Sequence, residues 1–157
     1  MPRVSAGIVL FRRRDGRLEV LLAHPGGPVW RRRDEGAWSV PKGEPDDGED
    51  DLLTVARREF EEETGHPLPE GGPTVHLGSI RQKGGKVVHA WAVEGDLDPA
   101  AAHSNEVSME WPPRSGRWLT FPEIDRVHWF EPAEARRRIK DTQIPLVDRL
   151  VDHLGDN

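Results

Sequence analysis

The sequence predicts an α+β fold built on a mixed β-sheet. Three observations favour this class: two strand-like segments joined by a tight turn near the N-terminus, one strongly amphipathic helix in the first half, and further strand-like segments followed by helices towards the C-terminus. The 157 residues are enough to bury one core, so we expect a single domain over residues 1–157.

The first two strands are expected at residues 4–12 and 18–24. Both segments are rich in apolar residues, and Asp15-Gly16 between them tolerates positive φ, which suits a tight hairpin turn. The two strands should therefore pair antiparallel.

A loop is expected next, because residues 24–36 are rich in Gly, Pro and Arg. Residues 37–40 predict a short extended piece that ends at Pro41, since a residue that precedes proline avoids the helical conformation. The side chains of this loop are expected to lie beside the helix that follows.

That helix has clear start and stop signals. Asp50 or Asp51 can cap its N-terminus, and Gly65, followed by Pro67, ends it. Its buried stripe is predicted to consist of four apolar residues at helical spacing: Leu52, Leu53, Ala56 and Phe60.

The second half of the chain predicts more strands and then helices. Residues 74–82 and 87–94 should form a hairpin through Gly84-Gly85. Residues 104–118, which contain SMEWPPRSGRW, match no motif and carry no assigned role. Further strands are expected at residues 107–111 and 127–130, and helices at residues 134–139, after Pro132, and at residues 145–154.

Composition limits the class of protein. The chain has no Cys, which excludes disulfides, thiolate zinc sites and cysteine nucleophiles and fits a reducing compartment. The apolar run near the N-terminus is too short to span a bilayer, so we expect a cytoplasmic protein without a membrane segment. A formal net charge of −6 makes nucleic acid an unlikely partner.

The central helix carries three glutamates at i, i+3 and i+4: Glu59, Glu62 and Glu63. They border the apolar stripe and are expected to be semi-buried, with Cβ atoms about 5–6 Å apart, where like charges repel. A divalent cation between them would remove this repulsion, and carboxylate oxygens suit Mg²⁺ or Mn²⁺. The alternative is a solvated charged face without a metal.

The same segment resembles the motif of the Nudix hydrolase family, G-x5-E-x7-R-E-U-x-E-E-x-G-U, where U is a bulky apolar residue. The resemblance implies a Nudix-like α/β/α sandwich with a mixed β-sheet and a catalytic loop-helix. The matching residues are Gly43, Glu49, Arg58, Glu59, Phe60, Glu62, Glu63 and Gly65.

Two positions depart from this motif. Eight residues, instead of seven, separate Glu49 from Arg58, and His66 occupies the final apolar position. Either Glu49 or Asp50 therefore fills the first acidic position of the motif.

The resemblance also implies roles for single residues. Glu59, Glu62 and Glu63 would bind the metal, with the carbonyl of Gly43 as a further ligand. Arg58 would hold the loop and the carboxylates in place, and Glu62 would act as the general base. The base varies within the family, so three other acidic residues stay open as alternatives: Glu106, Glu110 and Glu123.

The stretch AWSVPKGEPDDGEDDL is most similar to the diadenosine polyphosphate hydrolases of this family. The resemblance implies cleavage of a nucleoside diphosphate linked to another group, such as a dinucleoside polyphosphate, and a homodimer as the assembly to test. Nucleoside triphosphates including oxidised forms, ADP-ribose, and a nucleotide-sensing module without turnover are the alternatives.

Four residues are predicted to bind the substrate. Lys42 would meet a phosphate as a point charge, and Arg32, within Arg31–Arg33, would do so if the loop folds over the site. Trp30 is the predicted platform for a purine, and His24 ends a strand where it could reach a phosphate. An exposed loop and a packed histidine are the plainer interpretations of Arg32 and His24.

Overall fold

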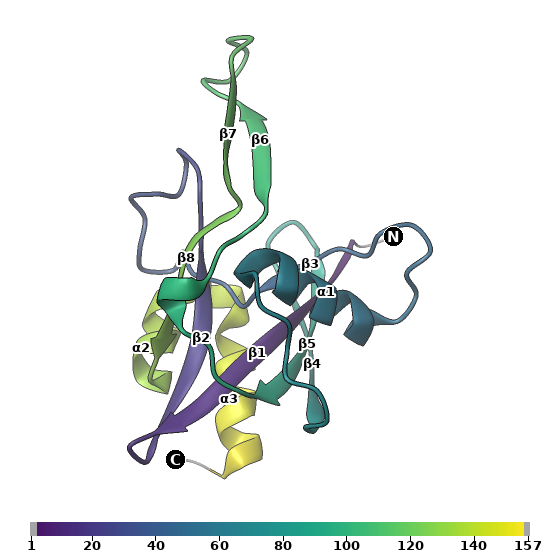
Figure 1. Cartoon of the computed structure of the whole chain (residues 1–157), viewed down its shortest axis with the longest axis vertical. Helices are drawn as coiled ribbons and strands as arrows, with labels where there is room; N and C mark the ends of the chain where they lie inside the picture. The colour runs from purple at the N-terminus through teal and green to yellow at the C-terminus, as the bar shows by residue number, and fades with distance from the viewer. Residues whose placement is uncertain (1–2, 156–157) are drawn as a thin grey trace.

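A six-stranded mixed sheet forms the centre of the computed structural model, which describes residues 3–155 (Figure 1). The strand order is β4-β5-β1-β2-β8, and β3 pairs with β1. β1 and β5 are parallel, whereas the remaining pairs of this sheet are antiparallel, which confirms the predicted mixed sheet. The strands are β1 (Val4–Arg14), β2 (Arg17–Pro25), β3 (Lys42–Gly43), β4 (Thr74–Arg81), β5 (Val87–Glu94) and β8 (Ile124–Phe130).

Helices cover both faces of this sheet. Because neighbouring residues of a strand point to opposite faces, Ile8 packs with α1 and Val9 packs with α3. The sheet thus has a separate apolar core on each side, as a three-layer α/β/α sandwich requires. The helices are α1 (Leu52–Thr64), α2 (Pro132–Arg138) and α3 (Ile144–Leu154), with short 3₁₀ turns η1 (Pro99–Ala101) and η2 (Asp141–Gln143).

The ends of α1 follow the predicted signals. The Asp51 carboxylate caps the helix by accepting the backbone N–H of Leu53 at 3.2 Å. Gly65 ends the helix with a φ of 76°, a conformation that favours glycine. The predicted stripe is only partly right: Ala56 and Phe60 are buried, whereas Leu52 and Leu53 in the first turn are half-buried, and Val55 completes the buried face.

Two strands differ from the sequence-based expectation. The extended piece predicted at residues 37–40 makes only isolated bridges at Trp38 and Ser39, and the strand that pairs with β1 lies just after it, at β3. The strand β7 (Trp118–Pro122) was not expected at all. It lacks a buried face, so the alternation that marks a strand in sequence is weak.

β7 pairs with β6 (Glu106–Glu110) in a separate two-stranded sheet that projects from the body of the protein (Figure 1). Residues 104–118, which match no motif, therefore form the first strand and the turn of this hairpin. Trp118 lies on it with 70% of its surface exposed. Within residues 3–155, no helix is long and apolar enough to cross a membrane.

Candidate active site

Arg58 on α1 holds the loop that precedes the helix. Its guanidinium donates to both carboxylate oxygens of Glu49, at 2.9 and 2.7 Å, and to the carbonyl of Glu44 at 3.1 Å. Glu49, not Asp50, is therefore the acidic residue that pairs with Arg58. Asp50 lies between Glu49 and the cap residue Asp51, so the extra residue of the motif is accommodated before the helix begins.

Arg58 also contacts two of the three helix carboxylates. It donates to Glu59 and to Glu62, at 3.0 Å in each case. The hydrogen bonds with Glu49 are the main reason that the pKa of Arg58 is raised. A single cation thus links the loop to the carboxylate cluster, which we define as Glu59, Glu62 and Glu63.

The members of the carboxylate cluster differ in burial. Glu59 and Glu63 are 9% and 5% exposed, whereas Glu62 is exposed, so two of the three glutamates are more buried than expected and the third is less buried. Burial, followed by repulsion from Glu123 and Glu59, raises the pKa of Glu63 well above its usual value. Burial and the nearby Glu62 also raise the pKa of Glu59. The buried carboxylates therefore lack sufficient positive charge nearby.

Gly43, in β3, lies directly against Glu59. A Cβ added at Gly43 would lie 2.0 Å from the Glu59 carboxyl carbon, so any larger residue would displace that carboxylate. Among residues 3–155 no group of three or more His, Asp or Glu side chains is already arranged around one point to hold a metal, and Arg58 donates hydrogen bonds to Glu59 and Glu62. The oxygen-only donor set and the uncompensated charge nevertheless fit a hard divalent cation.

A fourth carboxylate comes from the base of the projecting hairpin. Glu123 is close enough to raise the pKa values of Glu59 and Glu63. Asn105 holds it there: its side-chain amide donates to the Glu123 carboxylate at 3.0 Å, and its carbonyl accepts the Glu123 N–H at 2.9 Å. The Asn105 N–H in turn donates to the carbonyl of Glu62 at 2.9 Å.

The other two alternatives for the base lie elsewhere on this hairpin. Glu110 accepts the N–H groups of Arg114 and Gly116, each at 3.1 Å, and so stabilises the turn. Glu106 is exposed and pairs with Pro122 in the ribbon. Asn105 was missed from sequence, since a single Asn in a segment without a motif gives no signal.

Three lysines lie within electrostatic reach of one another, and one of them, Lys42, also reaches the carboxylates. Burial, followed by repulsion from Lys86 and Lys140, lowers the pKa of Lys42 to about 8, and Glu63 and Glu123 oppose this shift. Lys86 contacts Glu44 at 3.6 Å, whereas the side-chain ammonium groups of Lys42 and Lys140 have no carboxylate partner within 4.0 Å among the described residues. We call Lys42, Lys86 and Lys140 the lysine path. Lys86 and Lys140 were not anticipated, because they lie far from the motif in sequence.

Trp30 lines a cavity of about 280 Å³ near the end of this path, which we call the Trp30 cavity. The Lys140 ammonium lies 5.2 Å from the centroid of the Trp30 ring, and Arg33 lies 5.5 Å from it. Arg32 is exposed on the same loop. The other residues that line the cavity are Gly36, Gln82, Lys83, Asp141 and Thr142.

The prediction that His24 meets a phosphate is wrong. His24 is fully buried, and both of its ring nitrogens are already hydrogen-bonded, to the Asp125 carboxylate at 2.8 Å and to the carbonyl of Arg33. It fixes the loop that carries Trp30 and leaves no ring nitrogen for a ligand.

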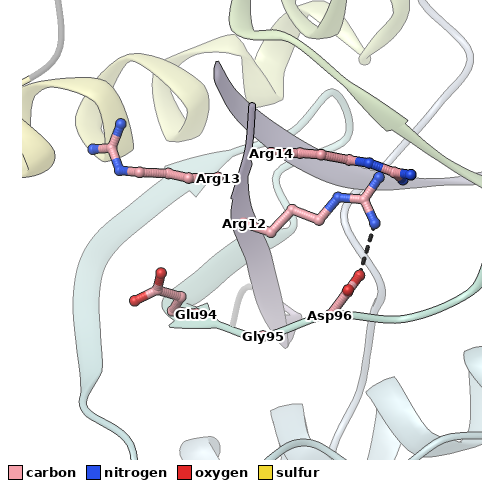
Figure 2. A pocket seen from close by; sticks show the side chains of 6 residues that line it. All are labelled: Arg12, Arg13, Arg14, Glu94, Gly95 and Asp96. Carbon is pink, nitrogen blue, oxygen red and sulfur yellow. Dashed lines mark hydrogen bonds and ion pairs between the residues drawn. The ribbon is translucent and has the colours of Figure 1, made fainter. Parts of the chain in front are cut away.

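A larger cavity of about 570 Å³ lies at the far end of β1, lined by Arg12–Arg14 and Glu94–Asp96 (Figure 2). Figure 2 shows Arg12 directed at Asp96, with a hydrogen bond of 2.7 Å, and Arg12 also pairs with Glu19 at 2.8 Å. The charge of Arg12 is therefore already balanced, and the carboxylate cluster lies beside the other half of β1, where β3 pairs.

With this geometry in place, we compared the chain with known proteins. The model of the NUDIX domain matches residues 1–150. The chain belongs to the NUDIX family. The predicted family and its α+β sandwich are thereby confirmed, and membership of the family supports the predicted enzyme class, a Nudix-type pyrophosphohydrolase.

Three solved NUDIX structures are similar to this chain in fold, although their sequence identity to it is low. The NUDIX domain of Shewanella oneidensis NrtR in complex with ADP ribose has a TM-score of 0.69 and 18% identity, over 98% of this chain and 89% of that one. A Caenorhabditis elegans (C. elegans) Ap4A hydrolase binary complex has a TM-score of 0.67 and 23% identity, over 96% and 98%. A NUDIX hydrolase from Nitrosomonas europaea has a TM-score of 0.58 and 21% identity, over 100% and 92%. A search of curated proteins returned no match.

Proposed function

We propose that this NUDIX member hydrolyses a phosphoanhydride bond in a nucleoside diphosphate linked to another group, with a dinucleoside polyphosphate as its substrate. The observation that carries the proposal is the lysine path beside the carboxylate cluster. Lys42 and Lys140 are buried or half-buried cations without a carboxylate partner in the described part of the chain, which is costly unless an anion binds. A chain of several phosphates supplies that charge.

Two further observations support a dinucleotide over a simple phosphate. Trp30 offers an aromatic surface for a base next to Lys140. The fold is also similar to that of the C. elegans Ap4A hydrolase. Arg32, exposed on the same loop, can reach a phosphate near Trp30 by rotation of its own long side chain.

The residues around Gly43 fit a divalent cation, Mg²⁺ or Mn²⁺. Glu59, Glu62, Glu63 and the Gly43 carbonyl would hold it, and the missing side chain at Gly43 leaves the room that the Glu59 carboxylate occupies. When bound, such a cation polarises phosphoryl oxygens, lowers the pKa of the attacking water and neutralises the leaving phosphate.

The chain's own groups perform the remaining steps. Glu62 is exposed and anchored by Arg58, so it can accept the proton of the attacking water, with Glu123 as the alternative base. The water forms a new bond to phosphorus as the bridging P–O bond breaks, which gives two phosphate-containing products. Lys42 binds a phosphate and thereby fixes the substrate relative to the carboxylates.

The proposal also covers the compartment, the partners and the assembly of the protein. A Cys-free chain fits the reducing cytoplasm, and we propose a cytoplasmic enzyme that acts on free nucleotides, not on nucleic acid, and that forms a homodimer.

The test is a substrate panel with Mg²⁺ or Mn²⁺ and chromatographic identification of the products. The panel contains diadenosine tetraphosphate, ADP-ribose, nucleoside triphosphates including oxidised forms, and a sugar nucleotide. Cleavage of diadenosine tetraphosphate into ATP and AMP, with the highest kcat/KM of the panel, is the expected result. Preferred turnover of ADP-ribose or a triphosphate would overturn the substrate assignment, and nucleotide binding without any turnover would instead indicate a sensing module.

A further inference from the structure

We propose that the Trp30 cavity is a second subsite of the active site, which binds the nucleoside monophosphate end of the substrate that lies away from the carboxylate cluster. The base would stack on Trp30 and the adjoining phosphate would bind Lys140. This inference rests on the proposed function and adds to it where the second nucleoside lies and which residues select for it.

The first argument is the rigidity of the loop that carries Trp30. Buried His24 bonds to the Arg33 carbonyl on one side and to Asp125 on the other. Asp34, one residue further on, accepts a hydrogen bond from the Trp38 indole at 2.8 Å. The indole of Trp30 is therefore held at the wall of a preformed cavity. Stacking of a base on it costs little conformational entropy, because the loop is already ordered.

The second argument is the position of Lys140. Its ammonium lies over the Trp30 ring at 5.2 Å, its side chain is half-buried, and it has no carboxylate partner within 4.0 Å in residues 3–155. The backbone holds it, because the Lys140 N–H donates to the Trp38 carbonyl at 2.8 Å. A phosphate at the mouth of the cavity would give this cation its counter-charge, and the ring would become available to a base.

The third argument is continuity with the carboxylate cluster. Lys42 is attracted by Glu63 and Glu123 and repelled by Lys86 and Lys140, so these groups lie within electrostatic reach of one another. Positive charge therefore continues from the carboxylates to the cavity. A polyphosphate chain that follows it would have its near end at the carboxylates and its far nucleoside at Trp30.

The cavity at Arg12–Arg14 (Figure 2) offers no comparable site. Arg12 is balanced by Asp96 and Glu19 and lies 4.2 Å from the Trp129 ring. Within the described part of the chain no aromatic ring lines this cavity, so the cavity lacks the combination of an uncompensated cation and a cavity-lining aromatic ring.

The test uses four variants of the subsite and two control variants. Trp30→Ala and Lys140→Ala remove the two recognition groups, whereas Trp30→Phe and Lys140→Arg keep an aromatic ring and a positive charge. Trp118→Ala removes an exposed indole from the hairpin and Arg17→Ala removes an exposed charge that is paired with Glu131, so both serve as matched controls.

The first readout is steady-state kinetics with diadenosine tetraphosphate. Trp30→Ala and Lys140→Ala should each raise KM by about 10-fold or more, the size of one lost base–aromatic stack or phosphate contact, with little change in kcat. The conservative variants should recover most of this loss, and the controls should behave as the wild type. An unchanged KM in both alanine variants would overturn the subsite while leaving the proposed function intact.

The second readout is independent of turnover. AMP binding is followed by tryptophan fluorescence in the presence of EDTA, where no hydrolysis occurs. Binding by the wild type that is lost in Lys140→Ala and kept in Lys140→Arg supports the subsite, even if the substrate panel disproves the proposed reaction. AMP binding that is equally strong in the wild type and in both alanine variants would refute it.

Discussion

Replacement of Arg58 by Ala should destabilise the protein and weaken its activity together. The side chain is 24% exposed and donates two hydrogen bonds to Glu49 and one to Glu59, both of which are also mostly buried. Hydrogen bonds to charged groups contribute about 1.5–3 kcal/mol each when buried, and partial exposure places these at or below the low end. The exposed contact with Glu62 adds only about 0.3–0.5 kcal/mol.

We therefore expect Arg58→Ala to lower the free energy of unfolding by about 3 kcal/mol. For a chain of 157 residues this corresponds to a fall in Tm of about 6–12 °C. Activity should fall by about 10- to 100-fold, as for other residues that orient metal-binding side chains. Loss of the cation also leaves Glu59 without its nearest positive charge.

The assay is thermal unfolding in EDTA, with kcat/KM measured separately in Mg²⁺. Arg57→Ala on the same helix removes the same charge and is the matched control. Arg58→Lys keeps the charge but loses the two-pronged contact with Glu49, so it should fall between wild type and Arg58→Ala. A Tm for Arg58→Ala within about 1 °C of Arg57→Ala would refute the role of Arg58 in holding the loop.

Three further changes test the carboxylate cluster. Glu62→Gln should reduce kcat by about 100-fold or more without changing the Tm, and unchanged phosphate release would rule out both roles given to Glu62. Because burial raises the pKa of Glu63, the folded protein keeps a proton there that the unfolded chain has lost, so metal-free stability should fall as pH rises above about 4.3. Urea midpoints between about pH 5 and 8 should fall less in Glu63→Gln than in the wild type, and parallel profiles would contradict the pKa shift. Gly43→Ala would place a Cβ 2.0 Å from the Glu59 carboxyl carbon, so a metal titration should show weaker binding, whereas wild-type affinity would disprove that contact.

The part of the site that lies on one helix could be predicted from the sequence. The spacing of Glu59, Glu62 and Glu63 fixes their relative positions, and the glycine at residue 65 marks where the helix ends. The choice between Glu49 and Asp50 could not be made, because it depends on how the loop folds back onto Arg58.

Two of the residues that reach the site from other elements could not be predicted. Lys86 and Lys140 come from the turn between β4 and β5 and from the segment after α2, and no local pattern relates them to Lys42. Glu123 was one of several equivalent acidic residues until its contact with Asn105 placed it beside the cluster. The prediction for His24 was wrong for the opposite reason. Its position at the end of a strand suggested access to a phosphate, but its side chain is buried in the fold.

The site places uncompensated charges of both signs side by side. Buried Glu63 lacks enough positive charge nearby, and half-buried Lys140 lacks a negative one, although Lys42 interacts electrostatically with both. Direct pairing of these groups would stabilise the free protein but would consume the charges that a metal and a phosphate chain require. A cation bound at the carboxylates and an anion bound at the lysines each remove a repulsion within their own group, and they also attract each other. Under the proposed function, the two ligands should therefore bind cooperatively, and the separation of charge in the ligand-free protein would favour a metal-bound polyphosphate over either ligand alone.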